Sequence, residues 1–230
     1  VDREFSETVA LALTLCQVNP LVVDIDDPTF EGGRLIGELT YEQLIAEGDQ
    51  DRQWHMPADE WQAISLNYTS GTTGNPKGVV YHHRGAYLTA MSMAFSWDMP
   101  KYPKFLTVVP MFHCNGWCFP WTTALMAGTN IFIRHLKPEV LLKLIKQEQV
   151  THFGGAPIVL NMLSNADEKD KTGITHQVKV MTAGAAPPAA VIEAMEKLGF
   201  DVTHVYGLTE TYGACVICEW QPDLWDHLPK

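Results

Sequence analysis

Two periodicities of hydrophobic residues alternate along the chain. Short apolar runs bounded by glycine, proline or polar residues predict strands at 21–25, 63–68, 105–109, 129–133, 150–153, 178–182, 202–205 and 214–219. Apolar residues at helical spacing predict helices at 6–18, 83–96 and 187–198, and shorter ones that begin near residues 41, 114, 138 and 157. This alternation is typical of an α/β fold with layered, largely parallel sheets flanked by helices.

Several of the predicted helices carry a recognisable start. Ser6 can cap the first helix, and Thr40 with Gln43 forms a capping-box pattern before the second. Pro138 and Pro157 stand where two later helices are predicted to begin, and proline is favoured at the first helical position. These signals support the helix assignments independently of periodicity.

The composition is that of an ordinary globular protein, with 46% hydrophobic and 19% charged residues. The length of 230 residues is compatible with one large domain or two modest ones, and the stretch 47–57 is the linker-like segment. Lys and Arg number 16 against 27 Asp and Glu, which leaves a net charge of −11. Because a nucleic-acid surface needs a basic stripe, we expect no nucleic-acid partner.

A long uncharged stretch, the cysteines and the first residues of the chain bear on membrane insertion and cellular compartment. The stretch Phe105–Ile133 contains no Asp, Glu, Lys or Arg, but Pro110 and Pro120 interrupt it, so we expect no integral membrane segment. Five scattered cysteines favour a reducing compartment over a disulfide framework, and the opening VDREF has no secretory character. We therefore expect a cytoplasmic protein, and the sequence is compatible with a homodimer.

The most distinctive stretch is YTSGTTGNPKGV at 68–79. Its glycines and hydroxyls can bring many N–H and O–H donors to one ligand, and its lysine adds a positive charge, so a triphosphate suits it. A Walker A loop fits poorly, because Pro76 stands where the second glycine belongs and Gly78 where the metal-binding hydroxyl belongs. A glycine-rich turn without a ligand is the alternative that composition alone leaves open.

Residues 69–78, TSGTTGNPKG, closely resemble the phosphate loop of adenylate-forming enzymes, the superfamily of acyl-CoA synthetases and luciferases. Three further stretches resemble motifs of that family and follow in its order: PMFH at 110–113, TAGAAP at 182–187 and YGLTET at 206–211. Taken alone, His113 on an apolar segment would more often be a satisfied core histidine. The resemblance covers most of the chain from 63 to 219 and implies part of the large N-terminal domain of an adenylating enzyme.

The resemblance implies a two-step reaction, in which a carboxylic acid and MgATP form an acyl-adenylate and pyrophosphate, and coenzyme A then displaces AMP. It implies nucleotide binding by Thr69, Ser70, Gly71, Thr72, Thr73, Gly74, Lys77, Gly184, Ala185, Ala186, Pro187, Tyr206, Gly207 and Thr209. Catalytic roles are implied for Lys77, His113, Thr209 and Glu210. Glu210 would hold Mg²⁺, for which a carboxylate is a suitable hard ligand.

The segment CNGWCFPW at 114–121 bears on the substrate. Trp117, Phe119 and Trp121 can wall a pocket for a small or medium apolar acid, and core packing is the alternative for each. If a helix begins after His113, Trp117 lies one turn on and on the same face. PMFHCNGW resembles the branch acting on short- and medium-chain acids, which includes methylmercaptopropionate–CoA ligases, and the resemblance places His113, Trp117 and Gly184 beside the acid.

Zinc or redox chemistry at the cysteines is not expected. Cys114 with Cys118, and Cys215 with Cys218, lack a matching set at zinc-finger spacing. The run GACVIC at 213–218 is interpreted instead as buried sheet.

Motifs that the family carries later have no counterpart here: an STGD-like aspartate for the ribose, a GRxKD-like hinge and a C-terminal domain with a catalytic lysine. We therefore interpret 1–230 as a partial adenylation domain of a longer parent, inactive alone. Two other functions stay open, namely a non-catalytic nucleotide-binding module and an adenylating enzyme with a different acceptor.

Overall fold

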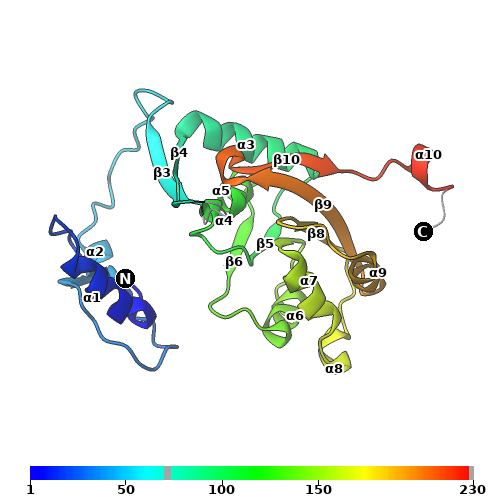
Figure 1. Cartoon of the computed structure of the whole chain (residues 1–230), viewed down its shortest axis with the longest axis horizontal. Helices are drawn as coiled ribbons and strands as arrows, with labels where there is room; N and C mark the ends of the chain where they lie inside the picture. Colours follow the sequence, from blue (N-terminus) through cyan, green and yellow to red (C-terminus); the bar gives the residue numbers. More distant parts are fainter. Residues whose placement is uncertain (70–73, 228–230) are drawn as a thin grey trace. The chain divides into compact units, whose positions relative to one another are not determined.

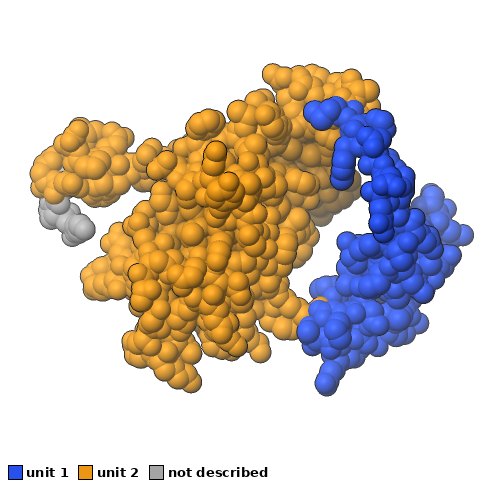
Figure 2. Space-filling model, turned by 180° about the vertical axis from the view of Figure 1, so that it is seen from behind, with its two compact units in different colours: residues 1–56 blue, residues 57–230 orange. Residues whose placement is uncertain are grey.

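The computed structural model describes residues 1–69 and 74–227. The chain divides into two compact units, Val1–Met56 and Pro57–Lys230, which Figure 2 distinguishes by colour. The boundary between them falls within the linker-like stretch 47–57.

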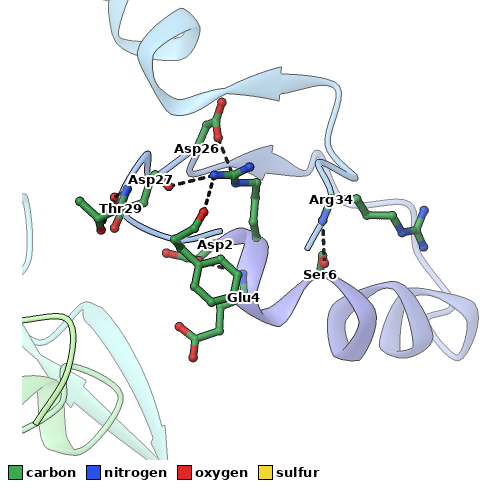
Figure 3. A network of polar contacts seen from close by, with 9 residues as sticks. Asp2, Glu4, Ser6, Asp26, Asp27, Thr29 and Arg34 are labelled. Carbon is green, nitrogen blue, oxygen red and sulfur yellow. Dashed lines mark hydrogen bonds and ion pairs between the residues drawn. The ribbon is translucent and has the colours of Figure 1, made fainter. Parts of the chain in front are cut away.

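The first unit contains η1 (Arg3–Phe5), α1 (Ser6–Thr14), β1 (Val23–Asp24), β2 (Leu39–Thr40) and α2 (Tyr41–Ala46), with β1 and β2 parallel. Arg3 holds its loop in place, since its Nη2 donates to the carbonyls of Asp27 at 3.0 Å and Phe30 at 2.8 Å. Figure 3 shows this network of polar contacts, with Asp26 and Asp27 labelled. The Nε of Arg3 pairs with the carboxylate of Asp26 at 3.0 Å. One arginine thus satisfies several loop acceptors in a unit with little regular structure.

The two helix starts predicted in this unit have different outcomes. The capping box is confirmed, because the Thr40 hydroxyl accepts from the Gln43 backbone and the Gln43 side chain accepts from the Thr40 backbone. The prediction that Ser6 caps the first helix is wrong. A short 3₁₀ turn precedes α1, so Ser6 lies inside the helical run, and its hydroxyl accepts from the Arg34 backbone N–H at 3.3 Å.

The second unit is built on a six-stranded sheet in the order β10-β9-β8-β7-β5-β6. Its strands are β5 (Lys104–Thr107), β6 (Thr129–Phe132), β7 (His152–Gly155), β8 (Val178–Thr182), β9 (Phe200–Leu208) and β10 (Gly213–Cys218). Strands β5 to β9 are parallel, and β10 runs antiparallel to β9. The predicted α/β fold with a largely parallel sheet is confirmed.

Helices cover both faces of this sheet (Figure 1). On one face, α3 (His83–Ser96) and α5 (Phe119–Leu125) bury a cluster that includes Met93, Phe105 and Phe119. On the other, α6 (Pro138–Gln147), α7 (Pro157–Ser164) and α9 (Ala189–Lys197) bury a cluster that includes Leu141, Phe153 and Leu160. The short helices α8 (Glu168–Lys171) and α10 (Pro222–Trp225) were not predicted.

The glycine-rich stretch lies in a separate hairpin. Strand β3 (Ala63–Tyr68) is confirmed, but it pairs antiparallel with an unpredicted strand, β4 (Gly78–His82). The Thr69 N–H donates to the Lys77 carbonyl at 2.9 Å, and the Lys77 N–H donates to the Thr69 hydroxyl at 3.2 Å. The loop therefore connects the two strands of an antiparallel hairpin, and neither strand belongs to the six-stranded sheet.

Two further expectations about this unit are wrong. The segment α4 (Cys114–Trp117) is not a right-handed turn, because φ lies between +45° and +68° at all five residues from Cys114 to Cys118. Helical spacing therefore does not relate His113 to Trp117. Strand β10 is an edge strand with Cys215 and Cys218 exposed, not buried sheet.

Candidate functional site

A cavity of about 530 Å³ opens where the parallel strands β5, β6, β7 and β8 end. Its wall is formed by residues 107–113 together with Trp117, Phe119, Phe132, Ile133, Arg134, Leu136, Gly154, Gly155, Ala156, Ile158, Val159, Met181, Ala183 and Gly184. In open α/β sheets, the crevice beyond the carboxyl ends of the strands is where ligands bind. The cavity is therefore the main candidate site of the second unit.

The lining of the cavity is largely apolar. Trp117 is 8% exposed and Phe119 is 1% exposed, so both rings are packed into the protein as well as bordering the cavity. The polar side chains in the wall are few, among them those of Thr107, His113 and Arg134. Such a lining favours a ligand with an apolar body and a small polar end.

Residues from two distant sequence segments meet in this wall, namely His113 and Trp117 from PMFHCNGW and Gly184 from TAGAAP. Gly184 has φ +91°, and no atom lies within 4 Å of the position where a Cβ would stand. Beyond it, Ala185 and Ala186 are exposed. Pro187 is half-buried and precedes α9.

The YGLTET stretch lies at the end of β9 and outside the cavity wall. Tyr206 and Gly207 belong to the strand, and Thr209 and Glu210 lie in η2 (Thr209–Thr211). The Tyr81 hydroxyl donates to the Thr209 carbonyl at 2.5 Å. Because Tyr81 lies on β4, this bond links η2 to the strand that follows the glycine-rich loop.

The predicted phosphate loop is described only at its ends. Ser70, Gly71, Thr72 and Thr73 lie outside the described residues. Gly74 has φ +122° and open space around it, which suits close approach of backbone to a ligand. Lys77 is exposed, so its ammonium is accessible to an anion.

Sequence reasoning missed an aromatic cluster beside these elements. The ring of Tyr81 stacks on that of Tyr212, with centroids 3.9 Å apart, and the Trp121 Nε1 donates to the Tyr212 hydroxyl at 2.6 Å. Burial raises the pKa of Tyr212 to about 12 and moves the pKa of Tyr81 well above its usual range. Both phenols are therefore neutral hydrogen-bonding groups at physiological pH, and Trp121 serves this cluster instead of the cavity wall.

The family model for AMP-binding enzymes matches residues 10–230. The chain belongs to the AMP-binding enzyme family.

Several curated relatives of this AMP-binding enzyme are similar over most or all of the chain. The acetate/butyrate–CoA ligase AAE7 of Arabidopsis thaliana, described as peroxisomal, is 46% identical over 100% of this chain and 42% of its own length. The 2-methylpropanoate–CoA ligase CCL4 of Humulus lupulus is 46% identical over 97% of this chain and 40% of its own length. The chain therefore spans less than half the length of these relatives.

Solved structures show the same architecture. The N-terminal domain of FACL13 from Mycobacterium tuberculosis, at 26% identity, superposes with a TM-score of 0.73 and covers 82% of this chain and 48% of that one. The anthranilate CoA ligase AuaEII in complex with anthranoyl-AMP has a TM-score of 0.80 at 22% identity, covering 94% of this chain and 42% of that one. The second likeness concerns the fold alone.

In this AMP-binding enzyme, the described residues contain no cluster of three His, Cys, Asp or Glu side chains that suits a metal. Mg²⁺ bound together with nucleotide phosphates needs only one or two protein carboxylates, because phosphates and water complete its octahedron. Glu210, exposed in η2, fits that requirement. Over the described part of the chain, no helix is long and apolar enough to cross a membrane.

Proposed function

We propose that the full-length protein activates a short- or medium-chain carboxylic acid with ATP and transfers the acyl group to coenzyme A. The observation that carries the proposal is that one largely apolar cavity brings together His113 and Trp117, from the stretch PMFHCNGW, and Gly184, from the distant stretch TAGAAP. The proposal is also supported by the similarity of this chain to relatives described as CoA ligases of acetate, butyrate and 2-methylpropanoate.

In the first step, a carboxylate oxygen attacks the α-phosphorus of ATP. A new phosphorus–oxygen bond forms as the bond to pyrophosphate breaks, so the protein must position the two reactants and neutralise charge. His113 orients the carboxylate at the cavity wall, Thr209 donates to an α-phosphate oxygen, and Lys77 offers charge to the departing pyrophosphate. Glu210 would hold Mg²⁺, which when bound with ATP neutralises phosphate charge.

In the second step, the sulfur of coenzyme A attacks the acyl carbon of the adenylate. A carbon–sulfur bond forms, the carbon–oxygen bond to phosphate breaks, and AMP leaves. An aliphatic acyl tail occupies the apolar cavity in both steps.

The cavity's volume and largely apolar lining support a substrate with an apolar tail. A volume of about 530 Å³ leaves room for acids longer than acetate, and Trp117 limits the length. A dicarboxylate would place its second charge in a wall whose lining is largely apolar and includes a positive charge at Arg134, at a large desolvation cost. Methylmercaptopropionate, whose thioether tail is neutral and apolar, belongs to the same proposed class.

The test incubates the full-length protein with ATP, coenzyme A and one acid at a time: acetate, butyrate, 2-methylpropanoate, methylmercaptopropionate, hexanoate or succinate. We expect AMP and pyrophosphate in equal amounts with each accepted acid, formation of its acyl-CoA, and poor use of succinate. Release of ADP and orthophosphate would reject the proposal. Acid-dependent AMP release without acyl-CoA would instead indicate another acceptor.

Residues 1–230 are proposed to form part of the adenylation domain, since they align with about 42% of the length of AAE7. The 230-residue chain should then release no AMP, whereas the full-length protein should do so under the same conditions. Turnover by the shorter chain at the full-length rate would contradict this assignment.

A further inference from the structure

The turn that brings Trp117 to the cavity has a backbone that needs support. Five consecutive residues, Cys114–Cys118, have φ between +45° and +68°, and only Gly116 among them lacks a Cβ. The left-handed region is unfavourable for residues with a Cβ, so such a run persists only where surrounding contacts hold it. Burial of Cys114, Trp117 and Cys118 supplies one part of that support.

Asn115 supplies hydrogen bonds between this turn and β3. Its Oδ1 accepts from the Ser65 hydroxyl at 2.7 Å and from the Asn67 Nδ2 at 3.0 Å. Its backbone N–H donates to the Asn67 Oδ1 at 3.3 Å, and the Tyr212 hydroxyl lies 3.5 Å from the Asn115 Oδ1. The turn is thus bound to the strand that enters the glycine-rich loop.

These bonds are largely screened from water. Asn67 is 4% exposed, and Ser65 and Asn115 are half-buried. A buried amide that loses its partner pays the full cost of desolvation, so these hydrogen bonds resist breaking. Asparagine also tolerates a left-handed backbone better than most residues, so Asn115 meets the conformational and the bonding requirement together.

We propose that Asn115 is a positioning residue that fixes Trp117 in the cavity wall and thereby sets the acyl length that the cavity accepts. It acts through the turn and does not touch the acid. The part concerning acyl length rests on the proposed function, whereas the part concerning the place of Trp117 does not.

The experiment compares Asn115→Gly with Asn115→Asp in the full-length protein. Glycine keeps the left-handed backbone and removes the acceptor, whereas aspartate keeps an oxygen acceptor for both donors on β3. Ser65→Ala is a third, less disruptive variant. It removes one of the donors to the Asn115 side chain and leaves every residue of the turn unchanged.

The first readout is fluorine NMR of protein labelled with 5-fluorotryptophan, in which Trp117→Phe identifies the Trp117 signal. We expect this signal to shift or broaden in Asn115→Gly and to keep its wild-type position in Asn115→Asp. The second readout is the ratio of kcat/KM for hexanoate to that for butyrate. This ratio should rise roughly tenfold in Asn115→Gly, because one or two net hydrogen bonds that hold the turn are lost. The KM for ATP should stay unchanged.

An unmoved Trp117 signal in Asn115→Gly, or a signal that moves equally in Asn115→Asp, would overturn the proposal. If Asn115→Gly does not fold, Ser65→Ala decides, since a displaced Trp117 signal supports the proposal and an undisplaced one overturns it. A wild-type protein that uses no acid would reject the proposed function alone, because the fluorine readout still tests the position of Trp117.

Discussion

Replacement of Trp117 tests the cavity and the left-handed turn at the same time. The indole is 8% exposed, packs in the cluster that contains Phe105 and Phe119, and borders the cavity. Truncating a buried tryptophan to alanine costs roughly 3–5 kcal/mol of unfolding free energy. Because part of the ring faces a cavity that exists already, we expect Trp117→Ala to fall near the lower end, at about 3 kcal/mol.

The backbone at this position makes a second, sharper prediction. Trp117 has φ +58°, which glycine adopts freely and alanine does not. Trp117→Gly should therefore be more stable than Trp117→Ala by about 1 kcal/mol, the reverse of their order inside a right-handed helix. Urea denaturation of the two variants measures this difference, and alanine as the more stable variant would refute the left-handed turn.

The same variants report on acid selectivity. Opening a pocket wall changes selectivity by roughly 1–3 kcal/mol per methylene, so the hexanoate-to-butyrate ratio of kcat/KM should rise at least about fivefold in Trp117→Ala. The matched control is Trp121→Phe, because Trp121 donates to Tyr212 and does not line the cavity. In Trp121→Phe, the hexanoate-to-butyrate ratio of kcat/KM should stay at the wild-type value. A Trp117→Ala variant that loses stability but keeps the wild-type profile would reject Trp117 as a wall of the acyl site.

Three other side chains give independent predictions. Glu210→Gln keeps size and removes charge, so it should slow adenylation at limiting Mg²⁺ and leave the melting temperature unchanged; an unchanged rate would exclude the metal role. Tyr81→Phe removes the bond to the Thr209 carbonyl, so it should raise KM for ATP several-fold and cost about 1 kcal/mol of stability; an unaltered KM for ATP would argue against coupling between β4 and η2. Burial, with nearby Lys179, lowers the pKa of His152 from 6.5 to about 4, so the unfolded state binds more protons between these values. The unfolding free energy of wild type relative to His152→Gln should then fall as pH drops from 6.5 to 4, and a constant difference would contradict this.

The sequence predicted the elements whose stability comes from local pattern. The stretch VKVMT at 178–182 is apolar except at Lys179 and Thr182, a composition that suits a mostly buried strand of a parallel sheet, and β8 has those bounds. Strand β4 was missed because its apolar pair, Val79 and Val80, is short and directly follows the polar loop. Its pairing with β3 is a non-local contact that periodicity does not encode.

The candidate site shows the same limit. Motif resemblance pointed to His113, Trp117 and Gly184, but the backbone that joins the first two is a left-handed turn and not the predicted helix. The dipeptide Asn115-Gly116 is a signal for positive φ that could have indicated this turn. Tyr81 could not be assigned from sequence, because its partner Thr209 is 128 residues away.

The most direct test of the central claim is ATP–pyrophosphate exchange by the full-length protein in the absence of coenzyme A. Exchange isolates the adenylation step, because labelled pyrophosphate returns to ATP only through a reversible acyl-adenylate. We expect exchange that requires a carboxylic acid, is supported by butyrate and hexanoate, and is weak with succinate. Exchange that proceeds equally without any acid, or hydrolysis of ATP to ADP in its place, would contradict the account.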